Sequence, residues 1–115
     1  MNSEPRIQRA KWRVLCIDDD PEVLEVLRIA LGTKHEVVLA RDGVEAIGLL
    51  DLCEPDFIVC DVRMPKMDGF QTVQAIRRHP RFYKVPVFFL TAEKQRAYAQ
   101  RGFTIGANLY LTKPF

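Results

Sequence analysis

Short apolar runs alternate with amphipathic segments along the whole chain. Five runs of four or five mostly apolar residues have the length and composition of buried strands, and they lie at residues 13–17, 36–40, 56–60, 87–90 and 108–111. Apolar residues recur at helical spacing between these runs, which predicts helices over residues 22–31, 43–52, 70 onward and 93–105. Strands that alternate with helices predict an α/β fold, a parallel sheet with helices on both faces.

Capping residues indicate where two of these helices begin. Asp20 stands before Pro21 at the start of the first helix, and Asp42 stands before the second. We expect Gly32 to end the first helix in the C′ position, where glycine is favoured. The stripe expected to face the sheet consists of Val23, Val26, Leu27 and Ala30, widened by Leu24 and Leu31.

Composition describes one ordinary globular domain. Of the 115 residues, 48% are hydrophobic and 28% charged, and the net charge of +2 is too small to imply nucleic-acid binding. No apolar run approaches the roughly 20 residues that span a bilayer, and the polar N-terminus lacks a signal-peptide pattern. We therefore expect a cytoplasmic protein with no membrane or direct nucleic-acid contact. The three cysteines lack metal-ligand spacing and are interpreted as buried small residues.

The expected domain begins after a short tail. Residues 1–12 are largely polar and are predicted to be loosely held, with Trp12 packing where the first strand begins. The domain itself is assigned to residues 13–115.

Reactive side chains stand where four of the predicted strands end. Asp18 and Asp19 follow the first strand, Asp61 the third, Thr91 the fourth and Lys113 the fifth. In open α/β sheets, chemistry takes place at the carboxyl ends of the strands, and the common order 2-1-3-4-5 makes the first and third strands neighbours. That order brings the three aspartates together in one crevice.

The residue types at this edge favour phosphoryl chemistry. Clustered carboxylates suit Mg²⁺, which keeps several waters and accepts a phosphate oxygen, while a hydroxyl and an ammonium suit the other phosphoryl oxygens. Asp61 is then the candidate nucleophile. A single aspartate at a strand end is more often a cap or a solvated terminus, but four matching strand ends favour the functional interpretation.

Four motifs in this chain resemble the signatures of response-regulator receiver domains, the phosphoacceptor domains of two-component signalling. They are Ile17-Asp18-Asp19-Asp20-Pro21, the stretch from Asp61 to Gly69 (DVRMPKMDG), Leu90-Thr91-Ala92, and the stretch from Tyr110 to Phe115 (YLTKPF). Together they cover the chain from about Arg13 to its end. The resemblance implies a flavodoxin-like fold with a doubly wound, five-stranded parallel sheet. It also implies a domain that catalyses only its own phosphorylation and dephosphorylation.

The resemblance also implies the role of each acidic residue. Asp61 would accept a phosphoryl group from a histidine kinase or a phosphotransfer protein. Asp18, Asp19 and Asp61 would hold Mg²⁺, with Asp19 as a direct ligand, and the backbone carbonyl of Arg63 would complete the ligands that the protein supplies.

The remaining site residues would sense phosphorylation. Thr91 and Lys113 would bind phosphoryl oxygens, and Tyr110 would turn inward as Thr91 moves, although a half-buried strand tyrosine fits the sequence almost as well. Arg63 and Glu93, each two residues past a site residue, could pair over the pocket and restrict attacking water. The helix over residues 93–105 has a thin apolar face and is the expected mobile element.

The family pattern continues beyond Phe115 with a fifth helix and, in many members, an output domain or effector. A chain without that helix would forgo on the order of 10 kcal/mol of gross apolar burial. We expect an excised receiver from a longer regulator, with a homodimer that covers the open face as an alternative.

Two rival functions stay open at this stage. A phosphatase that forms an aspartyl-phosphate, as in haloacid-dehalogenase-like enzymes, needs a second acid two residues after the nucleophile, and Arg63 occupies that position. A receiver-like interaction module that is never phosphorylated would not need the full set of site residues.

Overall fold

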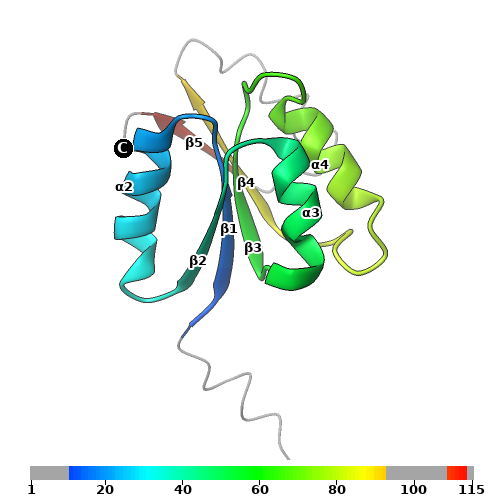
Figure 1. Ribbon diagram of the computed structural model, residues 1–115, viewed down its shortest axis with the longest axis horizontal. Helices are drawn as coiled ribbons and strands as arrows, with labels where there is room; N and C mark the ends of the chain where they lie inside the picture. The colour runs from blue at the N-terminus through cyan, green and yellow to red at the C-terminus, as the bar shows by residue number, and fades with distance from the viewer. Residues whose placement is uncertain (1–10, 93–108, 114–115) are drawn as a thin grey trace, which may run out of the picture.

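The computed structural model describes residues 11–92 and 109–113, with side chains for residues 11–90. Five parallel strands form one sheet in the order β2-β1-β3-β4-β5 (Figure 1). They are β1 (Arg13–Ile17), β2 (Glu36–Ala40), β3 (Phe57–Asp61), β4 (Val87–Ala92) and β5 (Leu109–Lys113). The predicted parallel sheet and its strand order are confirmed. The predicted helix over residues 93–105 and most of the predicted tail lie outside the described residues.

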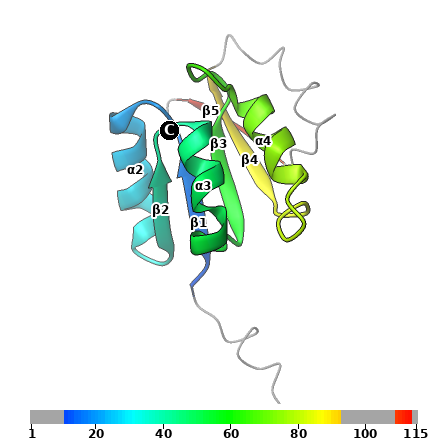
Figure 2. The same cartoon turned by 45° about the vertical axis from the view of Figure 1, so that its right-hand side comes forward.

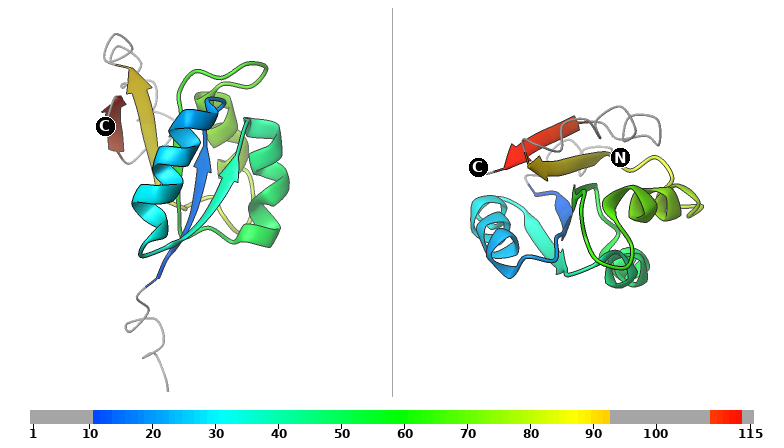
Figure 3. Two further views of the ribbon diagram at one scale, coloured as in Figure 1. Left: turned by 60° about the vertical axis from the view of Figure 1, so that its left-hand side comes forward. Right: turned by 90° about the horizontal axis from the view of Figure 1, so that it is seen from above.

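Among the described residues, three helices lie against the two faces of the sheet. Helix α2 (Pro21–Gly32) packs on one face, and α3 (Gly43–Cys53) and α4 (Gly69–Arg77) pack on the other (Figures 2 and 3). Because successive side chains of a strand point to opposite faces, β1 sends Cys16 towards α2 and Leu15 towards α3. Because β1 and β3 are parallel neighbours, their carboxyl ends meet at one edge of the sheet, between the two helical layers.

Side-chain caps begin the helices as the sequence predicts. Asp20 accepts a hydrogen bond from the backbone N of Glu22 at 2.9 Å, and Asp42 accepts one from Glu45 at 2.8 Å. The prediction for Gly32 is wrong, because the helix continues through it and Thr33 caps the helix at φ −68°.

The end of α2 needs no left-handed residue. The backbone N atoms of Lys34 and His35 both donate to the carbonyl of Leu31, at 3.2 and 3.0 Å. These two bonds close the last turn, so glycine's conformational freedom is not used there.

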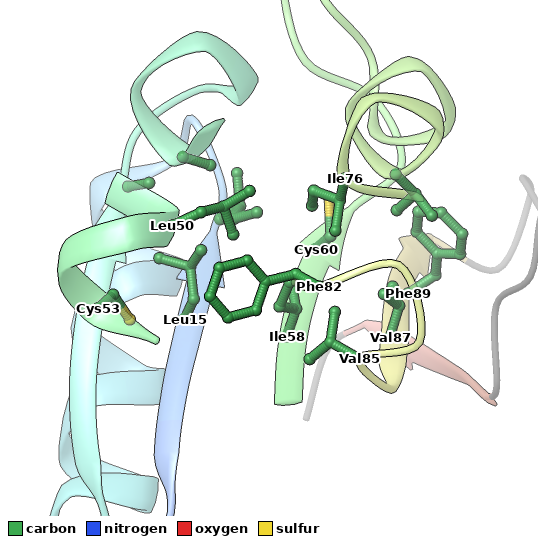
Figure 4. Packing of buried hydrophobic residues seen from close by; sticks show 14 of the residues in the cluster. Leu15, Leu50, Cys53, Ile58, Cys60, Ile76, Phe82, Val85, Val87 and Phe89 are labelled. Atoms are coloured by element: carbon green, nitrogen blue, oxygen red, sulfur yellow. The ribbon is translucent and has the colours of Figure 1, made fainter. Parts of the chain in front are cut away.

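The larger hydrophobic cluster lies between the sheet and α3 and α4 (Figure 4). Phe70 of α4 and Phe89 of β4 stack edge to face with their ring centroids 5.2 Å apart, and both are fully buried. Phe82, from the α4–β4 connection, inserts beside Leu15 and Ile58. This layer holds most of the buried hydrophobic residues among those that the structure describes.

The smaller cluster, beneath α2, corrects the predicted helix stripe. Leu24 and Leu27 are buried against the sheet, whereas Val26 is 45% exposed and Ala30 is also exposed. The helix therefore turns its 24–27–31 side inward. Trp12, expected to pack where β1 begins, has an exposed side chain, although its backbone N donates to His35 Nδ1 at 3.1 Å.

A chain of ionic contacts ties together the opposite, amino-terminal edge of the sheet. Arg13 of β1 donates to Glu54 at 3.1 Å, and Arg81 pairs with Glu54 and also with Asp51 at 3.4 Å. His79 Nε2 lies 3.0 Å from the same Asp51 carboxylate. This ionic edge joins β1, the end of α3 and the loop that follows α4.

Candidate functional site

Three carboxylates from two neighbouring strands converge at the carboxyl edge of the sheet. Asp18 directly follows β1, and Asp61 is the last residue of β3. Asp18, Asp19 and Asp61 each place one carboxylate oxygen within 4.8 Å of the other two. The structure therefore brings together the three predicted metal ligands from β1 and β3.

The two strand-end aspartates are buried, although they are charged side chains. Asp18 is fully buried and Asp61 is 4% exposed, while Asp19 is open to solvent. Buried carboxylates that lie this close repel each other unless protons or a cation offset the charge. Three oxygen donors of this kind fit a hard divalent cation such as Mg²⁺, which accepts carboxylate and water ligands.

Hydrogen bonds separate the roles of the three consecutive aspartates. Asp18 Oδ1 accepts from the backbone N of Asp20 at 2.9 Å, and the backbone N of Asp18 donates to the Ala40 carbonyl at 3.1 Å. Asp20 is occupied by its capping bond to Glu22. The assignment of Asp20 to capping is therefore confirmed, and Asp18 and Asp19 face the crevice with Asp61.

Gly69 lets helix α4 begin directly against the end of β3. A Cβ atom placed on Gly69 would lie 2.2 Å from the Asp61 carbonyl oxygen and 3.0 Å from the Val62 Cα. The Gly69 backbone N donates to the Val62 carbonyl at 2.8 Å. Any larger residue would push the backbone of the candidate nucleophile out of place. The sequence shows Gly69 only as the last residue of a motif, because its close approach to Asp61 depends on tertiary packing.

The loop between β3 and α4 is held by local bonds. Lys66 adopts a left-handed φ of 71°, and the backbone N of Met67 donates to Pro65 at 2.7 Å. Asp68 and Gln71 then form a reciprocal capping box at 2.8 and 2.9 Å. Arg63 lies in this loop with an exposed side chain, and the ligand role of its carbonyl stays a prediction.

Cys60 reports the negative charge that gathers in the site. Burial raises the pKa of its thiol well above 9.0, and the carboxylates of Asp61, Asp18 and Asp68 raise it further. On the α2 side of the sheet, burial and the nearby Cys53 raise the pKa of Cys16 to about 12. Both thiols therefore stay protonated and unreactive near neutral pH.

We expect the folded protein to resist thiol reagents at pH 8. A disulfide reagent should modify Cys16 and Cys60 at least ~100-fold more slowly in buffer than in denaturant, because burial denies both access and ionisation. A raised native pKa also means that the unfolded state loses its proton first. The stabilisation linked to Cys16 is therefore complete below pH 9.0 and is lost between pH 9.0 and about 12. Fast labelling of the native protein, or stability that rises through that range, would contradict the assignment.

The strand register places the remaining predicted site residues at the same edge. Leu90 pairs with Asp61 across β3 and β4, so Thr91 is one residue beyond the level of Asp61. Thr91 pairs with Thr112, and Lys113 ends β5 opposite Ala92. Tyr110 lies lower on β5, opposite Phe89.

Strands β4 and β5 are longer than predicted. Thr91 and Lys113 were expected to follow their strands, but they lie within β4 and β5. Pairing between these strands extends the ladder through both residues. The side chains of Thr91, Tyr110 and Lys113 and all of Glu93 lie outside the described residues.

Comparison with known families identifies this arrangement. The sequence model of one protein family, the response regulator receiver domain, matches residues 14–115. The chain belongs to this family. Receiver domains are signalling domains rather than a classical enzyme family, and the aspartate cluster at the carboxyl edge is typical of their phosphoacceptor site.

Known proteins are similar to this chain in sequence or in structure. The DNA-binding dual master transcriptional regulator RpaA of Synechocystis is 41% identical over 104 residues, which cover 90% of this chain and 43% of that protein. The chemotaxis response regulator CheY4 of Vibrio cholerae is 35% identical, with a TM-score of 0.83 over 94% of this chain and 89% of that one. The chain thus spans less than half the length of RpaA and most of CheY4.

One solved relative bears directly on the metal. The Mn²⁺-bound form of the response regulator Rcp1 has a TM-score of 0.76 and 27% identity, over 88% of this chain and 80% of that one. A divalent cation thus binds a protein of this fold. No helix that the structure describes is long and apolar enough to cross a membrane.

Proposed function

We propose that this chain is the phosphoacceptor receiver domain of a two-component response regulator, assigned to residues 13–115, with Asp61 as the phosphorylated residue. The observation that carries the proposal is the buried Asp61 carboxylate at the end of β3, within 4.8 Å of carboxylate oxygens of Asp18 and Asp19. Two carboxylates beside a nucleophilic third are suited to hold the cation that a phosphoryl donor needs.

The proposed reaction transfers one phosphoryl group to Asp61. A carboxylate oxygen of Asp61 attacks phosphorus, an O–P bond forms, the N–P bond of a phosphohistidine breaks, and the histidine nitrogen keeps the electron pair and takes up a proton. Asp18, Asp19, Asp61 and the Arg63 carbonyl would hold Mg²⁺. When bound, Mg²⁺ supplies positive charge that offsets the charge on the phosphoryl oxygens.

The chain's own residues position this chemistry. Gly69 fixes the backbone at Asp61 by its close approach, and Asp18 is oriented by its bond from Asp20. Thr91 and Lys113 reach the same edge in the strand register and would bind phosphoryl oxygens. Thr91 and Tyr110 would then switch a surface that controls an output domain or partner.

The proposed setting follows from the same family membership. The phosphoryl donor is a histidine kinase or a phosphotransfer protein, and the regulator works in the cytoplasm. Its outputs lie in partners or in further domains, since relatives such as RpaA are longer transcriptional regulators.

Mass spectrometry after treatment with acetyl phosphate tests the assignment. Wild type should gain one phosphoryl group in the presence of Mg²⁺, and Asp61→Asn should gain none, because the amide oxygen is not a nucleophile of comparable strength. Asp42→Asn is the matched control, since Asp42 follows β2 at the same edge and asparagine still caps α3. This control should be labelled as wild type is.

The other outcomes separate the rival functions. Labelling of Asp61→Asn at the wild-type level would overturn the assignment. A wild type that takes no label would indicate an interaction module, and turnover of unrelated phosphoesters would indicate a phosphatase.

A further inference from the structure

The outer edge of β2 is an open strand edge among the residues that the structure describes. In the strand order, β2 stands at one end of the sheet and pairs with β1 (Figure 3). An edge strand of this kind presents unpaired backbone groups to which another strand can add. Its chemistry specifies which strand fits.

Only two residues of β2 point their backbone groups outward. The N of Glu36 donates to Trp12, and the carbonyl of Ala40 accepts from Asp18, so residues 36, 38 and 40 bond to β1. Val37 and Leu39 therefore face outward. The positions that flank them are already occupied, since the His35 N donates to Leu31 at 3.0 Å and the Arg41 N to Glu45 at 2.6 Å.

The outward-facing edge formed by Val37 and Leu39 can pair with a second copy of itself. We propose that the β2 edge pairs with the β2 edge of a second copy of this chain, antiparallel and with the twofold axis at Val38. Val37 of each copy then faces Leu39 of the other, and each pair exchanges two N–H···O bonds. A twofold axis perpendicular to the sheet makes the contact isologous, so it closes at a dimer.

The surface on the α2 side of this edge has room for the second copy. One hollow of about 460 Å³ lies beside Val37, lined also by Arg28, Ile29, Gly32, Thr33 and His35. A second of about 320 Å³ lies beside Leu39, lined also by Pro21, Leu24, Glu25, Arg41 and Glu45. The α2 helices of the two copies would lie antiparallel across the seam.

Charge complementarity sets the register on that side. Glu25 lines the hollow at Leu39 and Arg28 the hollow at Val37, so the twofold at Val38 places Glu25 of one copy opposite Arg28 of the other. Within one copy the same two side chains form an exposed ion pair. The four charges would alternate around the axis, which favours this register over a shifted one.

The α3 side of the edge carries an exposed leucine. Val38 and Leu49 both pack against the larger core cluster. Glu45 of α3 accepts a hydrogen bond at 2.6 Å from the backbone N of the residue directly after β2. Leu52, two helical turns further along α3, lies on the same side of the helix and is 83% exposed. The exposed Gly48 on this helix has no atom within 4 Å of an added Cβ, which leaves space for a helix from the second copy.

Sedimentation velocity across a concentration series tests this pairing. Wild type should dimerise as its concentration rises. Leu52→Glu should weaken the dimer at least ~10-fold, because a charge would enter the apolar seam. Tyr83→Glu is the matched control, since Tyr83 is also exposed, at 52%, but lies in the connection between α4 and β4, away from β2 in the strand order, and it should leave the dimer unchanged.

Charge exchange tests the register independently. Glu25→Arg and Arg28→Glu should each weaken the dimer, and the double variant should restore it, because the opposite charges face each other again. Val37→Pro removes an outward N–H and should abolish the dimer while circular dichroism stays native. A wild type that stays monomeric at millimolar concentration, a dimer that tolerates both Leu52→Glu and Val37→Pro, or a double variant that fails to recover would overturn the proposal.

Discussion

Gly69→Ala is expected to destabilise the protein by about 3 kcal/mol, the scale of a severe steric insertion into a packed core. The added Cβ would meet the Asp61 carbonyl oxygen at 2.2 Å and the Phe89 ring at 3.0 Å. A backbone oxygen cannot move aside as a flexible side chain can, so either α4 or the end of β3 must shift. Urea denaturation followed by circular dichroism measures the loss.

Gly48→Ala is the matched control and should have the opposite sign. Gly48 lies inside α3, is exposed, and has no atom within 4 Å of an added Cβ. Alanine should therefore stabilise the protein by up to ~1 kcal/mol through helix propensity. If both variants changed the free energy of unfolding equally, close packing at Gly69 would not explain its effect. The Gly69→Ala variant should also take up phosphoryl label more slowly, because the Asp61 backbone is displaced.

Phe89→Ala is expected to cost about 3–5 kcal/mol of stability. The Phe89 ring is fully buried, packs edge to face on Phe70 and abuts Gly69 at the base of α4. Its removal leaves a cavity that the surrounding helices and strands can fill only in part. Single domains are commonly stable by 5–15 kcal/mol, so this loss should lower the urea midpoint severely.

Phe88→Ala, one residue earlier on the same strand, is the natural control. Phe88 points to the opposite face of the sheet, is only partly buried, and contacts Phe57 with ring centroids 5.4 Å apart. Its truncation should cost roughly 1–2 kcal/mol, because the partly buried Phe88 ring removes less apolar surface from water on folding than the Phe89 ring does. Equal losses at the two positions would contradict the view that the α3 and α4 side holds the principal core.

The parts of the fold that the sequence predicts well depend on local chemistry. The runs at β1 and β3 are apolar and short, and Asp20 and Asp42 cap helices through bonds to residues only two or three positions away. Alternation and handedness rules restrict such a chain to a few strand orders, of which 2-1-3-4-5 is a common one. The meeting of Asp18, Asp19 and Asp61 follows from that order.

The errors lie where distant residues decide. Seven of the nine residues from 23 to 31 are apolar, so periodicity could not show that α2 buries Leu24 and Leu27 and exposes Val26. Thr91 lies inside β4 because β5 pairs alongside it, which no local pattern records. The close approach of Gly69 to Asp61 likewise depends on where α4 packs.

The ionic edge around Arg13, Glu54 and Arg81 should make the stability of one end of the sheet more sensitive to salt than that of the other. The side chains of these three residues are 42–52% exposed, and exposed charges are screened over about 8 Å at physiological ionic strength. Concentrated salt should therefore weaken the ion pairs at the end of the molecule remote from Asp61 and leave the apolar packing unchanged. Changes in ionic strength should therefore affect the stability of one end of the domain more than the other. The effect should be small, because each exposed ion pair contributes no more than about 1 kcal/mol.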